Sequence, residues 1–241
     1  MQISSLSGLF DITGGLFWHA RALRFRHRLW RPFRENIKDF LGSAPQINSK
    51  PHPNLVLIGP SAGWCLSDEF LINYKQIICI DPDPLAPILF NLVHGKALRR
   101  AKVKVSWRRA DFFADPQGQL MGLEDPLILF CNVAGQFFLQ NHPEEHVKYV
   151  LSQMKYVLSN KDWGSFHDLY SAPLRRDLPM RIYSSRPDGK SLLMDYGLTG
   201  AWLDHLTGDF LPQALERRII AWQLKPDRVH LVEAGWVYAQ K

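Results

Sequence analysis

The stretch "LVLIGPSAG", Leu55 to Gly63, runs from four apolar residues into a turn of small residues. The apolar run has the length and composition of a buried strand. Residues 59–63 satisfy G-x-S-x-G, the elbow on which a hydrolase serine sits. The same small residues would let a backbone approach a nucleotide after the first strand of a nucleotide-binding sheet. The rest of the chain must decide whether Ser61 is a nucleophile or part of a ligand cradle.

On the C-terminal side of this stretch, short apolar runs alternate with helical patterns. Helices are expected from about Cys65, through "LAPILFNLVHGKAL" and through "EEHVKYVLSQMKYVL". The strand-like runs are "NLVLIG", "IICID", "KVKVSWRRAD", "PLILFCN" and "WGSFHDLYS". Strands that alternate with helices pair in parallel and carry helices on both faces of the sheet. We therefore predict a doubly wound α/β fold with a mostly parallel sheet.

The end of the chain departs from this alternation. The runs "RRIIAWQL" and "RVHLVEAGWVYAQ" are rich in branched and aromatic residues, and only Lys225-Pro226-Asp227 separates them. Three residues are too few for a helical crossover, so the two runs should form an antiparallel hairpin. With it, the predicted sheet has seven strands.

The N-terminal segment holds most of the net charge of +6, because residues 1–50 contain eight Lys/Arg against three Asp/Glu. Apolar residues at helical spacing predict one amphipathic helix that ends near Gly42: Leu16, Ala20, Leu23, Trp30, Ile37 and Leu41. Between them lie Arg21, Arg24, Arg28, Arg31 and Arg34, which we expect to form a solvated face. An anionic substrate, RNA or acidic lipid is the alternative partner for this face, and nucleic acid is not favoured, because such binders usually carry further basic patches.

The domain boundaries follow from composition. Residues 1–50 are predicted to be a basic helical cap with a linker, and residues 54–241 the main domain, with a substrate-side insertion at 171–215. Three dispersed cysteines indicate no disulfide framework, and no run reaches the roughly 18 apolar residues of a membrane span. The start has Asp11 and lacks a basic signal-peptide region, so we expect a cytoplasmic protein; an Arg-rich transit peptide remains the alternative.

Polar or glycine residues follow each of the first four predicted strands. They are the turn from Gly59 to Gly63, then Asp81 with Asp83, then Asp111, then Asn132. In an open parallel sheet the ligand crevice lies beyond the carboxyl ends of the strands, and an acid about twenty residues after the glycine turn can accept ribose hydroxyls. Each residue alone could serve as a turn or helix cap. Their common position predicts a nucleotide site.

With these residues in this order, residues 54–240 resemble the class I (Rossmann-like) S-adenosylmethionine (AdoMet)-dependent methyltransferases. That family also closes its sheet with an antiparallel last strand. The resemblance implies AdoMet as the cofactor and methyl transfer to an acceptor that it does not identify. The cofactor-binding residues that it implies are Gly59, Ser61, Gly63, Asp81, Asp83, Asp111 and Asn132. The sequence departs from the family at Pro60, at Ser61 in place of a glycine, and at Asn54 in place of an acid.

Residues after the fourth and fifth strands are the candidates for catalysis. We expect Asn132 and Gln136 to orient the acceptor and His167 to act as its base, supported by Asp168, with Tyr170 nearby. The structural alternative is that His167 points into the sheet and is satisfied by a neighbour. A basic stretch beside them could recognise an acidic acceptor, although a solvated loop is commoner: Arg175, Arg176, Arg181, Arg186 and Lys190.

Three other interpretations fit parts of the sequence. A hydrolase with Ser61 as nucleophile could draw on Asp204, His205 and His230, but such a fold normally places several strands before its elbow. His142 and His146 have a metal-like spacing that a helix start explains without a metal. The remaining alternative is an inactive domain of the same fold that binds a nucleotide or a partner.

Overall fold

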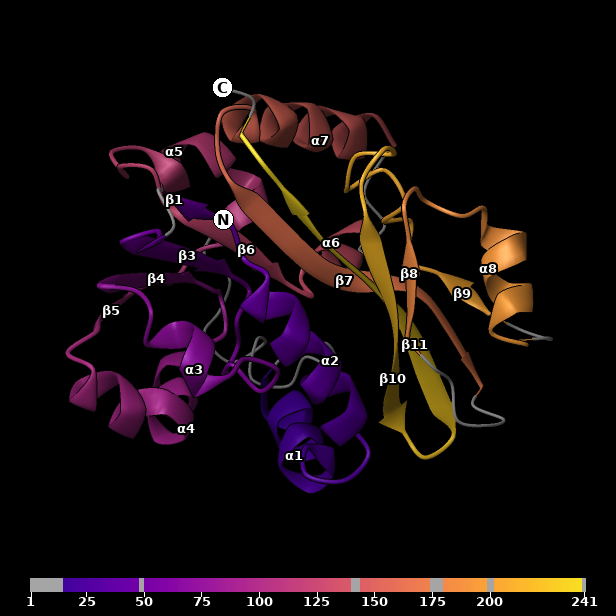
Figure 1. Cartoon of the computed structure of the whole chain (residues 1–241), viewed down its shortest axis with the longest axis horizontal. Helices are drawn as coiled ribbons and strands as arrows, with labels where there is room; N and C mark the ends of the chain where they lie inside the picture. The colour runs from indigo at the N-terminus through magenta and orange to yellow at the C-terminus, as the bar shows by residue number, and fades with distance from the viewer. Residues whose placement is uncertain (1–14, 48–49, 140–143, 174–179, 199–201, 240–241) are drawn as a thin grey trace.

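A computed structural model of the chain describes residues 15–47, 50–139, 144–173, 180–198 and 202–239. Its main sheet has nine strands in the order β5-β4-β3-β6-β7-β11-β10-β8, with β9 paired to β7 (Figure 1). The five strands that pair in parallel are β3 (Asn54–Ile58), β4 (Gln76–Ile80), β5 (Lys104–Arg108), β6 (Leu127–Cys131) and β7 (Trp163–Pro173). The strand order reverses between β3 and β6, which places the ligand crevice of such a sheet at their carboxyl ends.

The predicted C-terminal hairpin is confirmed. Strands β10 (Arg217–Lys225) and β11 (Arg228–Val237) pair antiparallel, and β11 also pairs antiparallel with β7. The insertion adds two short strands that the sequence did not predict, β8 (Arg181–Tyr183) and β9 (Leu203–Asp204), and helix α8 (Gly189–Asp195). The seven predicted strands are therefore present, and the insertion extends their sheet.

Helices cover both faces of the sheet, as a doubly wound fold requires. They are α1 (Gly15–Phe25), α2 (Arg31–Gly42), α3 (Asp68–Leu71), α4 (Ala86–Arg100), α5 (Pro116–Leu120), α6 (Ala134–Leu139) and α7 (Glu144–Leu158). Helices α2, α3 and α4 pack on one face, in a core that includes Leu57 and Trp222. Helices α5, α6 and α7 pack on the other face, in a core that includes Ile58 and Phe130. Adjacent residues of β3 thus point into different cores, as the pleat of a strand dictates.

The N-terminal segment differs from the prediction of one helix. A turn at residues 26–30 divides it into α1 and α2, and in α1 the predicted apolar residues Leu16 and Leu23 are more than half exposed. In α1, His19 and Ala22 are buried instead. Helix α2 buries Phe33, Ile37, Phe40 and Leu41 in the main core, so the predicted boundary at residues 50–54 separates two segments that share one core. Between them, β1 (Gln46–Ile47) and β2 (Lys50–Pro51) form a small separate sheet.

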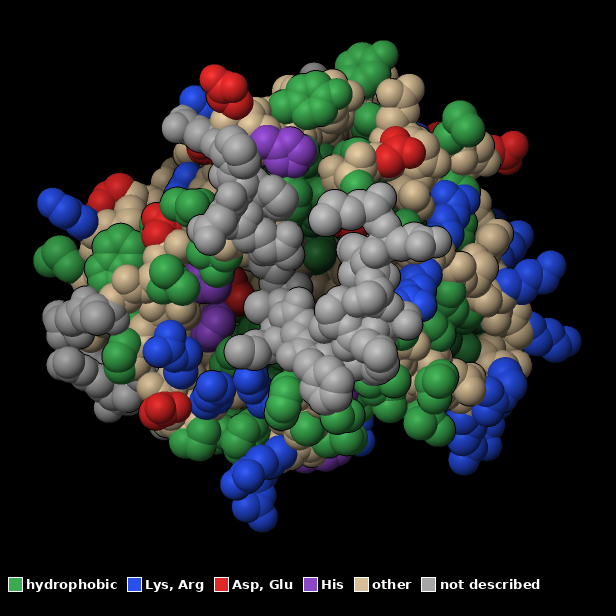
Figure 2. Space-filling view, turned by 180° about the vertical axis from the view of Figure 1, so that it is seen from behind, with side chains coloured by type: hydrophobic (Ala, Val, Ile, Leu, Met, Phe, Trp, Pro, Cys, Tyr) green, Lys and Arg blue, Asp and Glu red, His purple; other side chains and the backbone are tan. Residues whose placement is uncertain are grey.

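Charge is also distributed differently from the prediction. Of the five arginines expected to be solvated, Arg24, Arg28 and Arg31 are exposed, whereas Arg21 and Arg34 are partly buried. A second basic segment, which the sequence analysis missed, covers the end of α4 and β5: residues 94–110 contain seven Lys/Arg and no Asp or Glu. Figure 2 shows Lys and Arg side chains gathered along the side of the molecule that carries α4 and β5. None of the described helices is long and apolar enough to cross a membrane.

Candidate functional site

The turn at residues 59–63, after β3, is hydrogen-bonded to Asp81, the acid that directly follows β4. The Ser61 amide donates to Oδ2 of Asp81 at 2.7 Å, and the Asp83 amide donates to Oδ1 at 2.8 Å. Gly59, Ser61 and Gly63 all have positive φ, and a Cβ on Gly59 would lie 2.6 Å from Cβ of Val133. Only glycine fits at residue 59, because it tolerates this φ and leaves room for Val133. The turn and the acid therefore form one preorganised unit, which we call the cradle (residues 59–63 with Asp81).

Asp81 is 6% exposed, and burial raises its pKa to about 6, although its two backbone hydrogen bonds act in the opposite direction. Each of its carboxylate oxygens accepts one N–H and keeps a second lone pair that could accept a ligand hydroxyl. The hydroxyl of Ser61 is buried and has no hydrogen-bond partner among the described residues. The cradle thus holds a buried polar atom without a partner, beside an acid with spare acceptor capacity.

Helix α1 lies against the cradle. Nε2 of His19 is 2.9 Å from Oδ2 of Asp83, and its Nδ1 accepts a 3.0 Å hydrogen bond from Nε1 of Trp64. The guanidinium of Arg26, just beyond α1, lies 4.9 Å over the Trp64 ring. Asp83, predicted to bind the cofactor, therefore pairs with α1 here, and α1 lies beside the cradle.

The third and fourth strand ends carry Asp111 and Asn132. Asp111 is exposed, three residues past β5, and its Oδ1 accepts a 3.0 Å hydrogen bond from the Phe113 amide. It therefore caps the short 3₁₀ turn at Phe112–Ala114. Asn132 follows β6 directly, has φ of 56°, and exchanges two hydrogen bonds with Asp168. The side-chain amide of Asn132 thus ties the end of β6 to Asp168 within β7, just past the residues of β7 that pair with β6.

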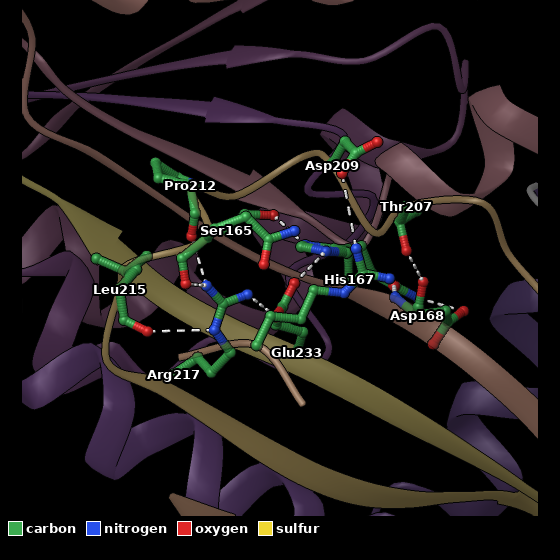
Figure 3. A network of polar contacts seen from close by, with 12 residues as sticks. Ser165, His167, Asp168, Thr207, Asp209, Pro212, Leu215, Arg217 and Glu233 are labelled. Carbon is green, nitrogen blue, oxygen red and sulfur yellow. Dashed lines mark hydrogen bonds and ion pairs between the residues drawn. The ribbon is translucent and has the colours of Figure 1, made fainter. Parts of the chain in front are cut away.

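His167 does not suit the role of base that the sequence predicted. It is fully buried, its Nδ1 lies 2.9 Å from Oγ of Ser165, and its Nε2 lies 3.1 Å from Oε2 of Glu233. Figure 3 shows it inside a polar network that continues to Arg217, which pairs with Glu233 and donates to the carbonyl oxygen of Gln213. Burial alone would raise the pKa of Glu233, but His167 and Arg217 outweigh it and lower that pKa. His167 thus points into the sheet and contacts polar neighbours there, as the structural alternative expects.

Asp168, the next residue, lies at the carboxyl edge with two histidines. Oδ2 of Asp168 is 3.1 Å from Nδ1 of His230 on β11, and His205 follows β9 close by. One ligand atom from each of the three lies within 4.8 Å of the others, and all three residues are buried. On sequence alone, His205 and His230 are candidates only as partners of Ser61. Pairing β11 beside β7 is what brings His230 to Asp168, and no local pattern signals it.

The other predicted residues lie elsewhere. Tyr170 is buried in the core of the insertion, its ring 5.2 Å from that of Trp202. Arg181 is exposed on β8, with its guanidinium 5.6 Å from the Tyr196 ring centre, and Arg186 lies 3.7 Å from Asp209. Arg175, Arg176 and His142 lie outside the described residues.

The hydrolase interpretation fails on geometry. A nucleophilic serine needs a base within hydrogen-bond reach, and the Ser61 hydroxyl has none among the described residues. His205 and His230 instead gather around Asp168.

Neither a scan against protein-family models nor a search of curated proteins gives a match. Among solved structures, the chain is similar to the N-methyltransferase NodS of Bradyrhizobium japonicum, solved with S-adenosyl-L-homocysteine (17% identity, 96% of both chains, TM-score 0.40). It is also similar to an O-methyltransferase family protein of Burkholderia thailandensis (10% identity, 93% of this chain and 59% of that one, TM-score 0.46). A third is a Rhodobacter sphaeroides protein assigned to the Zn-dependent alcohol dehydrogenases (16% identity, 70% and 56%, TM-score 0.42).

The chain thus spans a little over half the length of the second and third of these proteins. Identities this low carry no inference about activity. The strand order does not depend on these comparisons: five parallel strands and an antiparallel last strand between β7 and β10 form the sheet that the resemblance to the class I (Rossmann-like) AdoMet-dependent methyltransferases implied.

Proposed function

We propose that this chain binds AdoMet at the cradle and transfers its methyl group to an acceptor at the ends of β6 and β7. The observation that carries the proposal is the hydrogen bond between the turn at residues 59–63 and Asp81. The Ser61 amide donates to Asp81 at 2.7 Å, so the small-residue turn of the first parallel strand and the acid of the second form one site. This edge is where ligands bind in open α/β sheets.

The residues present suit such a ligand. Asp81 can accept a ribose hydroxyl with a free lone pair, and the buried Ser61 hydroxyl lacks a partner that a polar ligand atom would supply. Helix α1 would cover the bound molecule, since His19 already holds it at Asp83. The departures at Pro60 and Ser61 are accommodated, because Gly63 donates to the Pro60 carbonyl at 2.8 Å and closes the turn.

Bound AdoMet supplies a methyl group on an electrophilic sulfonium centre. The protein must then bring the acceptor in line and exclude water, since proximity and alignment account for much of such a reaction. Asn132 and Asp168 are fixed to each other at the adjoining strand ends and can orient the acceptor. Asp168, His205 and His230 are titratable groups at this edge, and one of them would act as the base in place of His167.

Isothermal titration calorimetry with AdoMet and S-adenosylhomocysteine tests the proposal. We expect micromolar affinity for both, and at least a tenfold loss for Asp81→Asn, because its amide group would face a backbone N–H donor. Ser61→Ala removes only the hydroxyl and should weaken binding by about three- to tenfold, as one hydrogen bond is worth roughly 1 kcal/mol. Asp39→Asn, at an exposed residue of α2, is the control and should bind normally.

Circular dichroism of each variant separates lost binding from lost folding. If the folded wild-type protein binds neither ligand, the proposal is wrong, and the domain is of the inactive or partner-binding kind.

A further inference from the structure

The three side chains of Asp168, His205 and His230 meet at one point of the carboxyl edge. They come from three elements: β7, the segment after β9, and β11. Asp168 is 7% exposed, His205 6% and His230 8%, and their ligand atoms lie within 4.8 Å of one another. The rings of His205 and His230 are 5.5 Å apart.

Three polar atoms of this cluster have no hydrogen-bond partner among the residues that the structure describes. They are Oδ1 of Asp168, Nε2 of His205 and Nδ1 of His230. Nδ1 of His230 lies 3.1 Å from Oδ2 of Asp168, which is close enough for an ion pair when the ring is protonated. A buried polar atom without a partner is costly, and three at one point are unusual among folded proteins. Their lone pairs would be satisfied together by a single cation between them.

The surroundings hold these side chains as the second layer of a metal site does. Nδ2 of Asn132 donates to Oδ2 of Asp168 at 3.2 Å, and the Thr207 hydroxyl donates to the Asp168 carbonyl at 2.7 Å. The His205 amide donates to the Leu169 carbonyl at 2.9 Å, which fixes the backbone that carries the ring. Such contacts orient ligands and tune the affinity of a metal site.

We propose that Asp168, His205 and His230 bind one divalent first-row transition metal ion, with Zn²⁺ as the best match. Two imidazoles and one carboxylate form the donor set of catalytic sites that keep a further position open. A hard cation such as Mg²⁺ prefers oxygen ligands and is a poor match for two histidines. Bonds of roughly 2.0–2.2 Å to one ion would bring the three ligand atoms closer together than the 4.8 Å within which they now lie.

The cluster combines a negative charge with an apolar wall. Asp168 supplies its carboxylate, whose charge attracts a cation. The imidazole rings of His205 and His230 coordinate a metal ion in their neutral form. Trp222, with its ring centre 6.2 Å from that of His230, supplies an apolar wall.

Titration of the full-length, EDTA-treated protein with Co²⁺ tests this site, because Co²⁺ bound by histidines in a low-symmetry site absorbs visible light. We expect one equivalent to bind, Zn²⁺ to displace it, and Zn²⁺ to raise the melting temperature. His205→Asn and His230→Asn should each lower Co²⁺ affinity at least 100-fold. Asn132→Ala removes a supporting contact and should lower it about 10- to 100-fold.

His52→Asn is the matched control. His52 is also buried, but its two ring nitrogens are already bonded to the Asp125 carbonyl and to Asp162, each at 3.0 Å. This variant should lose stability but keep the visible absorption spectrum of bound Co²⁺. The proposal is overturned if the wild-type protein binds no stoichiometric Co²⁺ or Zn²⁺, or if both cluster variants retain the spectrum. The metal assay does not depend on AdoMet, so its failure is distinguishable from failure of the proposed methyl transfer.

Discussion

Asp81 shows how one residue can serve both the fold and the site. Its two oxygens accept the amides of Ser61 and Asp83, which fixes the turn after β3 relative to β4. The same burial that makes these bonds strong disfavours its charge and raises its pKa to about 6. The folded protein therefore favours the protonated form of Asp81. In the unfolded chain the same carboxyl loses its proton at lower pH, near its ordinary pKa of 3.8.

The sign of the pH effect follows from this pKa. The contribution of Asp81 to stability is fully present below its ordinary pKa of 3.8, and it is lost as the pH rises through about 6. We expect the unfolding free energy of wild type minus that of Asp81→Asn to fall by roughly 2–3 kcal/mol between about pH 4 and about pH 7. Urea denaturation at a series of pH values measures it. The exposed Asp39→Asn should show no such trend, and a flat difference for Asp81→Asn would contradict the raised pKa.

At the scale of elements, the β7, β10 and β11 strands are joined by charges as well as by hydrogen bonds. Arg217 on β10, Glu233 on β11 and His167 on β7 are all fully buried, and three main-chain carbonyls also accept from Arg217. Figure 3 shows how the chain around Pro212 and Leu215 turns back over the guanidinium. Burying these groups is acceptable only because each has partners.

Removing the arginine should therefore be costly. We expect Arg217→Met to lower the unfolding free energy by about 3–5 kcal/mol, because it leaves Glu233 charged and buried. Urea denaturation followed by circular dichroism measures it, and the double variant Arg217→Met, Glu233→Leu should recover part of the loss. Arg218→Met changes the neighbouring, partly exposed residue and should have an effect below about 1 kcal/mol. Equal effects at residues 217 and 218 would show that the buried pairing is not what stabilises the hairpin.

At the scale of the whole molecule, the N-terminal segment is part of the main core. Phe33 stacks on Trp222 with ring centres 4.5 Å apart, and Phe40 stacks on Trp236 at 4.9 Å. The indole of Trp30 donates to the Leu224 carbonyl and that of Trp236 to the Phe40 carbonyl. These contacts join α2 to the C-terminal hairpin, about 190 residues away along the chain.

We therefore expect one cooperative unfolding transition for residues 1–241. Tryptophan fluorescence and far-ultraviolet circular dichroism should give the same urea midpoint. Phe33→Ala should lower the unfolding free energy measured by both signals by about 3–5 kcal/mol. Phe17→Ala, at a residue of α1 that is 54% exposed, should change that free energy by no more than about 0.5 kcal/mol in either signal. Separate midpoints would mean that the N-terminal segment unfolds independently, as the predicted boundary at residues 50–54 implied.

The sequence by itself determined the seven main strands, their parallel and antiparallel parts, and the strand ends that carry Gly59, Asp81 and Asn132. Those features depend on local patterns: apolar runs, turn residues and the number of residues between strands. Only the tertiary structure decided that α1 and α2 are two helices in the main core, that His167 is buried, and that His205 and His230 meet Asp168. These outcomes depend on the register of β11 on β7 and on which face each residue occupies. Register and facing are set by packing between segments far apart in the chain, and a one-residue shift reverses them.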